Sequence, residues 1–273
     1  MQPGTLPHGQ GKSRLTVRKK ILAHGRLLGL VYGIVAVVAV WWCLSLLGAG
    51  QFIPGPGPVI LRFLTLFPRS LALHAGASLG RIAAALALSL ATAAPAGMAI
   101  GGNRRLDRSL APVIYILYPV PKIALLPVLM LVFGLGDPSK VLVVFLVLFF
   151  QILVTVRDAT REVPPQFLVS LRSLGGKRRH AVRYVLLPAL TPALLSSLRI
   201  GTGTALAVLF FSETFGTSTG LGWFVMESWM RMSYTDMFAG ILCLGLLGLV
   251  LFLAIDFLQR GLCRWQDTDS TRP

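Results

Sequence analysis

Charged side chains are scarce in this chain, since Asp, Glu, Lys and Arg make up 13% of its 273 residues, about half the usual share of a soluble domain. Acidic residues are scarcer still, with ten Asp and Glu against 26 Lys and Arg. So few carboxylates leave little material for paired-carboxylate catalysis. Instead, 55% of the residues are hydrophobic and the mean hydropathy is +0.74. This composition excludes an ordinary soluble domain and indicates an integral membrane protein.

Cysteine and histidine are too few and too scattered to predict a site. The three cysteines form no C-x-x-C pair, and we interpret them as packing residues. The four histidines have no Ser/Asp neighbours or metal-ligand spacing. These residues are Cys43, Cys243, Cys263, His8, His24, His74 and His180. No catalytic residue, metal site or disulfide is therefore predicted.

A complete nucleotide-binding motif is also missing. GQGKS at residues 9–13 resembles the end of a phosphate-binding loop, but Leu6 stands where its first glycine is required. We therefore predict no cofactor. Any energy that the protein uses must come from a gradient or from another subunit.

Six apolar segments are long enough to cross roughly 30 Å of hydrocarbon. They are residues 27–49, 74–101, 110–134, 139–157, 191–215 and 236–259. The predicted fold class is therefore an all-α membrane protein with about six transmembrane helices. The predicted organisation is a basic cytoplasmic tail at 1–26, a transmembrane domain at 27–260 and a second cytoplasmic tail at 261–273.

Basic residues are concentrated in every second segment outside the predicted spans. They gather before the first span, at 102–108, at 157–190 and after residue 260. Cytoplasmic segments are rich in Lys and Arg, so both termini are predicted in the cytoplasm. The net charge of +16 thus fits membrane topology, and no nucleic-acid partner is predicted.

Prolines interrupt the third span at Pro119, Pro121 and Pro127. A broken helix is tolerated at membrane depth only where neighbouring helices or a water-filled path satisfy the freed carbonyls. Residues 119–127 are therefore a candidate pathway lining, with a packed kink as the alternative. Lys122 is a candidate pathway residue, although a lysine can also extend to the headgroups.

Glu213 lies near the outer end of the fifth span. A charge at the bilayer centre costs roughly 2.5–3.5 kcal/mol, so such residues tend to face a cavity or a partner. We expect a gating role for Glu213, with an interfacial carboxylate in water as the alternative. Gly220, Leu221 and Gly222 follow, and their glycines allow a tight turn at the outer face.

Close helix contacts are possible at three glycine pairs separated by three residues. The pairs are Gly29/Gly33, Gly76/Gly80 and Gly97/Gly101. Because glycine is common in membrane helices, the pattern does not say which of them lie at interfaces.

The longest internal segment that cannot lie in hydrocarbon spans residues 158–190 and is strongly basic. Its first apolar residues recur at helical spacing, and they are Phe167, Leu171 and Leu174. Gly175 and Gly176 are expected to end that helix. A second amphipathic run follows, and Pro188 and Pro192 mark where it is expected to give way to the fifth span.

The spacing within this loop resembles a signature of binding-protein-dependent ABC importer permeases, in the branch that includes nitrate, sulfonate and taurine permeases. In that family a cytoplasmic loop has Glu-Ala-Ala, three residues, Gly, nine residues and then Ile-x-Leu-Pro. Here nine residues separate Gly175 from Val185-Leu186-Leu187-Pro188. Val169-Ser170-Leu171 replace Glu-Ala-Ala, so one polar contact of the signature is missing.

The resemblance covers residues 50–230, with the sixth span behind it. The matching segments are IPGPGPV after the first span, SLGR at 78–81, PVPKIALLPVLMLVFGLG at 119–136, LPALTPALLSSLRIG at 187–201, and Glu213 with Gly220-Leu221-Gly222. It implies a type I importer permease fold in the plasma, or bacterial inner, membrane.

The resemblance also implies partners and residue roles. Two ATPase subunits, which bind ATP and Mg, would supply the energy, so the chain itself is expected to be no enzyme. A periplasmic binding protein would deliver a small solute, and the second permease subunit is expected to be another copy. The implied coupling residues are Leu171, Arg172, Leu174, Gly175, Val185, Leu187 and Pro188. The candidate translocation or gating residues are Pro121, Lys122, Glu213, Gly220, Leu221 and Gly222.

Two other classes of membrane protein make different predictions. A gradient-driven secondary transporter, the main alternative, predicts internal repeats and more acidic residues within the membrane. A membrane-embedded enzyme predicts clustered His, Asp or Ser near one membrane face. The sequence shows neither pattern.

Overall fold

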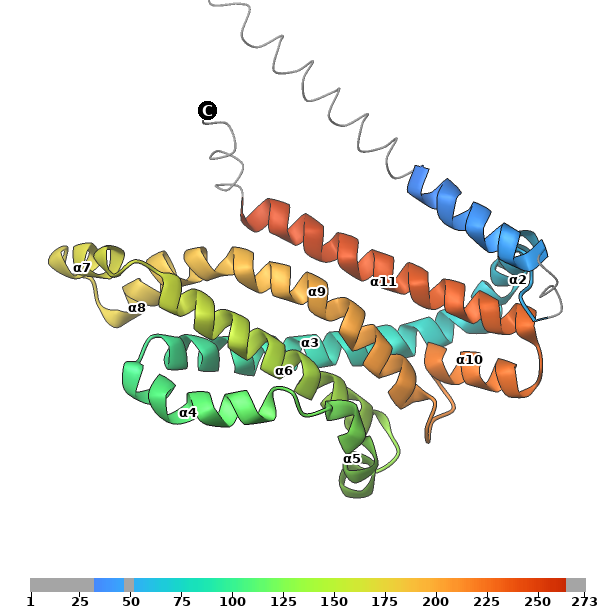
Figure 1. Ribbon diagram of the computed structural model, residues 1–273, viewed down its shortest axis with the longest axis horizontal. Coiled ribbons are helices and arrows are strands. Elements are labelled where there is room, and N and C mark those ends of the chain that lie inside the picture. The colour runs from blue at the N-terminus through green and yellow to red at the C-terminus, as the bar shows by residue number, and fades with distance from the viewer. Residues whose placement is uncertain (1–31, 47–51, 264–273) are drawn as a thin grey trace, which may run out of the picture. The chain divides into compact units, whose positions relative to one another are not determined.

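The computed structural model describes residues 32–46 and 52–263, and its described elements are all helical (Figure 1). The chain divides into two compact units, residues 1–61 and 62–273. In the first unit, a helix spans Tyr32–Leu46, and the Trp41 indole donates a 3.0 Å hydrogen bond to the Pro54 carbonyl.

The remaining helices follow one another with short connections. They are α2 (Pro56–Leu66), α3 (Ala72–Gly101), α4 (Arg104–Leu117), α5 (Leu126–Phe133), α6 (Asp137–Glu162), α7 (Pro165–Ser173), α8 (Arg178–Ala181), α9 (Leu187–Glu213), α10 (Leu221–Met230) and α11 (Tyr234–Leu262). π-Helical turns at Phe67–Leu71 and Val182–Leu186 join α2 to α3 and α8 to α9. A 3₁₀ turn at Lys122–Leu125 precedes α5.

Four helical runs within the described residues are long and apolar enough to cross a membrane. They are Pro56–Gly101, Asp137–Glu162, Arg178–Glu213 and Tyr234–Leu262. A fifth span is formed if α4 and the Lys122–Phe133 segment count as one, since the two are bent by 80° at the predicted break. The all-helical fold class is thereby confirmed.

The predicted count of six spans and the cytoplasmic termini stay predictions. The predicted first span, 27–49, lies partly outside the described residues, and its described part, Tyr32–Leu46, is a shorter apolar helix. The predicted tail at 1–26 and all but the first three residues of the tail at 261–273 also lie outside the described residues.

Two predicted boundaries do not coincide with breaks between helices. The connection predicted at 102–108 is only Gly102 and Asn103, because the Asn103 side chain accepts a 3.0 Å hydrogen bond from the Arg105 amide and caps α4. Pro188 and Pro192 do not separate two helices, since the helical run is continuous from Arg178 to Glu213. Pro188 lies in the first turn of α9, directly after a π-helical turn that accommodates its missing amide hydrogen.

The core of the second unit forms where α3 packs along α6 and α6 packs along α9. Large fully buried side chains from these helices include Ile82, Val143, Leu148 and Leu209. One of the three glycine pairs lies in this core: a Cβ at Gly97 would lie 2.8 Å from the Leu153 carbonyl oxygen of α6. The packing of these three helices therefore fixes the positions of their ends, where candidate sites lie.

Candidate functional site

Glu213, the last residue of α9, is completely buried and fully paired. Its carboxylate accepts hydrogen bonds from the Ser78 hydroxyl at 2.8 and 2.9 Å and from Arg81 Nη1 at 2.7 Å. The Gly222 amide donates a further bond of 2.9 Å. A buried carboxylate persists only with such partners. The alternative of an interfacial carboxylate in water is therefore wrong for this structure.

Arg81, on α3, connects three other segments through its guanidinium group, which is 4% exposed. Nε donates to Asp137 at the start of α6 at 2.8 Å, and Nη1 donates both to Glu213 and to the Thr219 carbonyl at 2.9 Å. Nη2 donates to the hydroxyls of Thr219 and Thr217 at 2.9 and 3.4 Å. Every donor of the guanidinium group thus has an acceptor. The arginine fixes the ends of α6 and α9 and the loop that follows α9.

The turn after α9 is closed against the same cluster by the amides that begin α10. The Gly220 amide donates to His74 Nδ1 at 3.2 Å and the Leu221 amide to the Ser78 hydroxyl at 2.9 Å. With Gly222, three successive amides at a helix N-terminus, which would otherwise lack partners, are satisfied by side chains. The positive end of α10 also lies beside the Glu213 carboxylate.

Glycine is required at position 220. Its φ is +114°, and a Cβ there would lie 2.4 Å from the Glu213 carboxyl carbon and 2.6 Å from Arg81 Nη1. The predicted tight turn is therefore present. The structure brings four of the predicted residues together in one site around the buried Glu213, which we call the outer cluster after the membrane face at which the sequence predicts it. Its members are Glu213, Gly220, Leu221 and Gly222, joined by His74, Ser78, Arg81, Asp137 and Thr219.

Five members of the outer cluster were missed by the sequence reasoning as functional residues. Three of them, His74, Ser78 and Arg81, recur at i, i+4 and i+7, which places them on one face of α3. A polar stripe of this kind in a membrane helix was the available signal.

Lys140, near the start of α6, is a second buried cation close to the same turn. Its ammonium donates to the carbonyls of Leu135 at 2.5 Å, Gly136 at 3.3 Å and Gly216 at 3.5 Å. Among the residues that the structure describes, no carboxylate lies within ion-pair distance of it. Lys140 therefore ties the segment before α6 to the turn after α9 through carbonyl oxygens alone.

The basic loop forms a second, separate site. Helix α7 ends at the predicted glycine pair in a Schellman motif, with the Gly176 amide bonded to the Leu171 carbonyl and the Gly175 amide to the Arg172 carbonyl, both at 2.9 Å. Gly175 has φ +77°, the left-handed conformation that glycine adopts at little cost. The prediction that these glycines end the helix is confirmed.

Helices α7 and α8 extend past the ends of α6 and α9 (Figure 1). Apolar side chains are exposed on this segment, with Leu174 at 86% and Phe167 at 60%. Its Lys and Arg side chains are exposed, and they are Arg172, Lys177, Arg178, Arg179 and Arg183. An exposed apolar surface with basic residues around it is typical of a protein interface.

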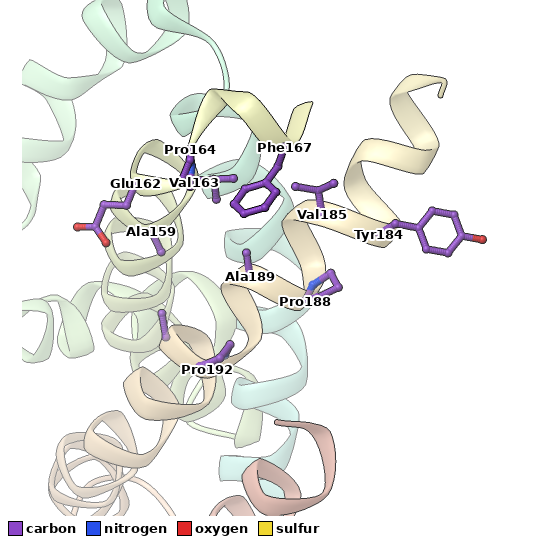
Figure 2. Close-up of a pocket in the computed structure, with 11 residues that line it drawn as sticks. Ala159, Glu162, Val163, Pro164, Phe167, Tyr184, Val185, Pro188, Ala189 and Pro192 are labelled. Atoms are coloured by element: carbon purple, nitrogen blue, oxygen red, sulfur yellow. The ribbon is translucent and has the colours of Figure 1, made fainter. Parts of the chain in front are cut away.

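A pocket of about 680 Å³ lies between the base of α7 and the start of α9 (Figure 2). Figure 2 shows the Phe167 ring facing Val185 across it, with Pro188 below and Tyr184 directed outward. The predicted coupling residues therefore divide into those that line the pocket and those that do not. Val185 and Pro188 line it. Of the others, Leu171 is half-buried, and Arg172, Leu174, Gly175 and Leu187 are exposed.

Pro121 and Lys122 lie at the break after α4. Pro121 precedes the 3₁₀ turn, and the Lys122 ammonium donates to the carbonyls of Leu117 and Tyr118 at the end of α4. None of these hydrogen bonds goes to the outer cluster. Pro121 and Lys122 thus lie in a third site, separate from the outer cluster and from the basic loop.

The sequence comparison decides the family. Residues 83–266, more than half of the chain, match the model of the binding-protein-dependent transport system inner membrane component. The chain belongs to this family. It is a permease of an ATP-driven ABC importer and spans the plasma membrane several times.

Relatives of the permease cover nearly its whole length. The taurine transport system permease protein TauC of Escherichia coli is 30% identical over 88% of this chain and 90% of its own. The putative aliphatic sulfonates transport permease protein SsuC of Bacillus subtilis is 28% identical over 97% and 96%. The bicarbonate transport system permease protein CmpB of Synechococcus elongatus is 26% identical over 96% of both chains.

A solved structure supports the fold of the permease. A chain of the MetNI methionine ABC transporter, in an inward-facing conformation, aligns with a TM-score of 0.61 at 19% identity. The alignment covers 70% of the permease and 95% of that chain. At this identity the likeness concerns the arrangement of helices.

Proposed function

We propose that residues 162–188 form the surface through which ATPase subunits drive this permease. The observation that carries the proposal is the capped helix α7, which holds exposed Leu174 and Arg172 beyond the ends of the membrane helices. A rigid, capped helix transmits a movement of the ATPase subunits to the membrane helices, whereas a flexible loop would change its own conformation instead. The spacing from Gly175 to Pro188 supports the same assignment.

The partners follow from this surface and from the systems to which the relatives belong. Two ATPase subunits contact the loop and bind ATP and Mg. A separate binding protein delivers the solute at the opposite face of the membrane. A second copy of the permease completes the pathway. ATP binding then biases the permease toward one conformation and hydrolysis releases it. The chain itself catalyses no reaction in this proposal.

The missing glutamate of the signature affects the partner contact and not the fold of the loop. Val169 stands at its position and is 59% exposed. A side chain at this position faces away from the permease, and α7 forms its cap without it. We expect the ATPase to meet a smaller, apolar contact here.

Replacing Gly175 with Val tests the coupling surface. Nothing lies within 4 Å of a Cβ at Gly175, so the substitution opposes only the left-handed conformation, by about 1–2 kcal/mol, which corresponds to about five- to thirtyfold in an equilibrium. We expect substrate-stimulated ATPase activity and uptake in proteoliposomes to fall by at least about fivefold, with an unchanged amount of permease in the membrane. The probes are taurine, an alkanesulfonate and bicarbonate.

Gly134→Val is the matched control for this experiment. Gly134 has φ +81° and ψ 175°, a conformation that also disfavours a side chain, and nothing lies within 4 Å of a Cβ there. The substitution therefore imposes a conformational cost at a place outside the loop. Coupled ATPase activity should survive in this variant. Normal uptake with Gly175→Val, or equal losses in both variants, would remove the coupling assignment.

A further inference from the structure

Several cations in the membrane helices have a carboxylate partner. Arg62 pairs with Asp236 at 2.5 Å, Arg157 with Asp107 at 2.5 Å, and Arg199 with Asp256 at 3.5 Å. Arg81 is held in the outer cluster. Within the described ranges, Lys122 and Lys140 have no carboxylate within 4.0 Å. Lys140 is completely buried, so of these two lysines Lys122 is the one that another molecule can approach.

Lys122 lies in the wall of a pocket of about 350 Å³, formed where the break after α4 meets α6 and α9. This volume is in the range of small-ligand sites. The lining residues are Tyr118, Val120, Lys122, Val147, Phe150, Gln151 and Thr204. Aromatic rings and a few polar groups around one charge are the composition of a site that orients a small polar molecule.

The Lys122 ammonium is held in place and retains donor capacity. Two of its three hydrogens are used by the Leu117 carbonyl at 2.9 Å and by the Tyr118 carbonyl. The nitrogen also lies 4.7 Å from the centre of the Phe150 ring and 5.5 Å from that of Tyr118. Capping the end of α4 accounts for these two hydrogen bonds. It leaves the third hydrogen unused and the charge without a counter-ion.

Two further lining residues supply polar groups from α9 and α6. Thr204 of α9 has a hydroxyl for which the described part of the chain provides no hydrogen-bond partner, whereas the nearby Thr202 hydroxyl bonds to the Leu198 carbonyl at 2.8 Å. Gln151 of α6 donates one amide hydrogen to the Ser197 carbonyl at 3.2 Å. Its second amide hydrogen has no acceptor among the described residues.

We propose that this pocket binds the oxyanion group of the transported solute, a sulfonate or carboxylate, during its passage. The proposal rests on the proposed function, because it places the pocket on the pathway of the permease. Free donors on Lys122, Thr204 and Gln151 match the acceptor oxygens of such a group. The bound anion supplies the counter-charge that Lys122 lacks.

Charge-selective labelling of a cysteine in the pocket tests this inference without transport. Thr204→Cys is prepared with exposed Cys43 replaced by Ser, while buried Cys243 and Cys263 are kept. The permease–ATPase complex is reacted with sulfonatoethyl methanethiosulfonate, which is an alkanesulfonate, and with its trimethylammonioethyl counterpart. Lys122→Gln should lower the ratio of the anionic to the cationic rate by about tenfold, the effect of removing one nearby charge.

Competition distinguishes binding from general attraction of anions. Methanesulfonate should slow labelling more than chloride at the same ionic strength, and only while Lys122 is present. Arg69→Gln, which removes an exposed cation outside the pocket, should leave the ratio unchanged. Val147→Cys, also in the lining, provides a second reporter if Thr204→Cys perturbs folding.

An equal ratio with Lys122 and with Gln at that position in both reporters, or equal effects of methanesulfonate and chloride, would overturn the proposal. Either result would leave the coupling proposal intact, because labelling involves no ATPase-driven step. Conversely, a failure of the Gly175 experiment would leave the labelling result unaffected.

Discussion

Replacing Arg81 with Met is expected to lower the free energy of unfolding of the permease by about 3–5 kcal/mol, because it leaves the buried Glu213 carboxylate without its counter-charge. Glu213 is 0% exposed and Arg81 4% exposed, so water cannot replace the lost partner. The same change removes the bonds to Asp137 and to the Thr219 carbonyl. Uptake should be abolished together with stability, and thermal unfolding in detergent measures the first effect.

Glu213→Gln should impair uptake more than assembly. A glutamine keeps the shape and an acceptor for Ser78 or Gly222, and Arg81 retains Asp137 as its counter-charge. In the double variant, Arg81→Met with Glu213→Gln, no buried carboxylate is left unpaired, so part of the loss should be recovered. A double-mutant cycle measures this coupling. Unchanged uptake in Glu213→Gln would remove the gating role.

Arg62→Met is the matched control for Arg81→Met. Arg62 also pairs with a carboxylate, Asp236 at 2.5 Å, but its side chain is 46% exposed. Exposed pairs contribute about 0–1 kcal/mol. A loss in Arg81→Met that is no larger than the loss in Arg62→Met would contradict the importance of the outer cluster.

Part of the outer cluster was predictable from the sequence and part was not. Glu213 is conspicuous because it is a carboxylate in an apolar span, and the glycines after it indicate a turn. Arg81 lies 132 residues earlier in the chain, and no local pattern pairs it with Glu213. The pairing is a consequence of how α3 packs beside α9, which is a tertiary property.

In the basic loop and in the broken span, too, local features were predictable from the sequence and tertiary features were not. The end of α7 at Gly175 was predictable, because a Schellman motif depends on a few consecutive residues. The break at Pro119 and Pro121 was predictable for the same reason, whereas its 80° bend was not. At Pro188 the local rule located the start of α9 but not the continuity of the run, since a π-helical turn lets the helix continue through the proline.

The spacing of the glycine pairs does not show which pair lies at a contact between helices. Gly76/Gly80 and Gly97/Gly101 have the same spacing in one helix, so the sequence could not separate them. In the structure, a Cβ at Gly76 or Gly80 would meet nothing within 4 Å, whereas one at Gly101 would lie 2.4 Å from the Arg157 carbonyl oxygen. Only the second pair permits the close approach of α3 to α6.

Gly97→Val is therefore expected to lower the free energy of unfolding by at least about 3 kcal/mol, the upper part of the range for overpacked cores. The new Cβ alone would lie 2.8 Å from the Leu153 carbonyl oxygen and 2.9 Å from the Val156 Cβ. Because both neighbours belong to α6, the two helices must separate. Gly80→Val adds the same side chain to open space in the same helix and should cost less than about 1 kcal/mol. Equal losses of thermal stability in the two variants would show that α3 does not depend on its contact with α6.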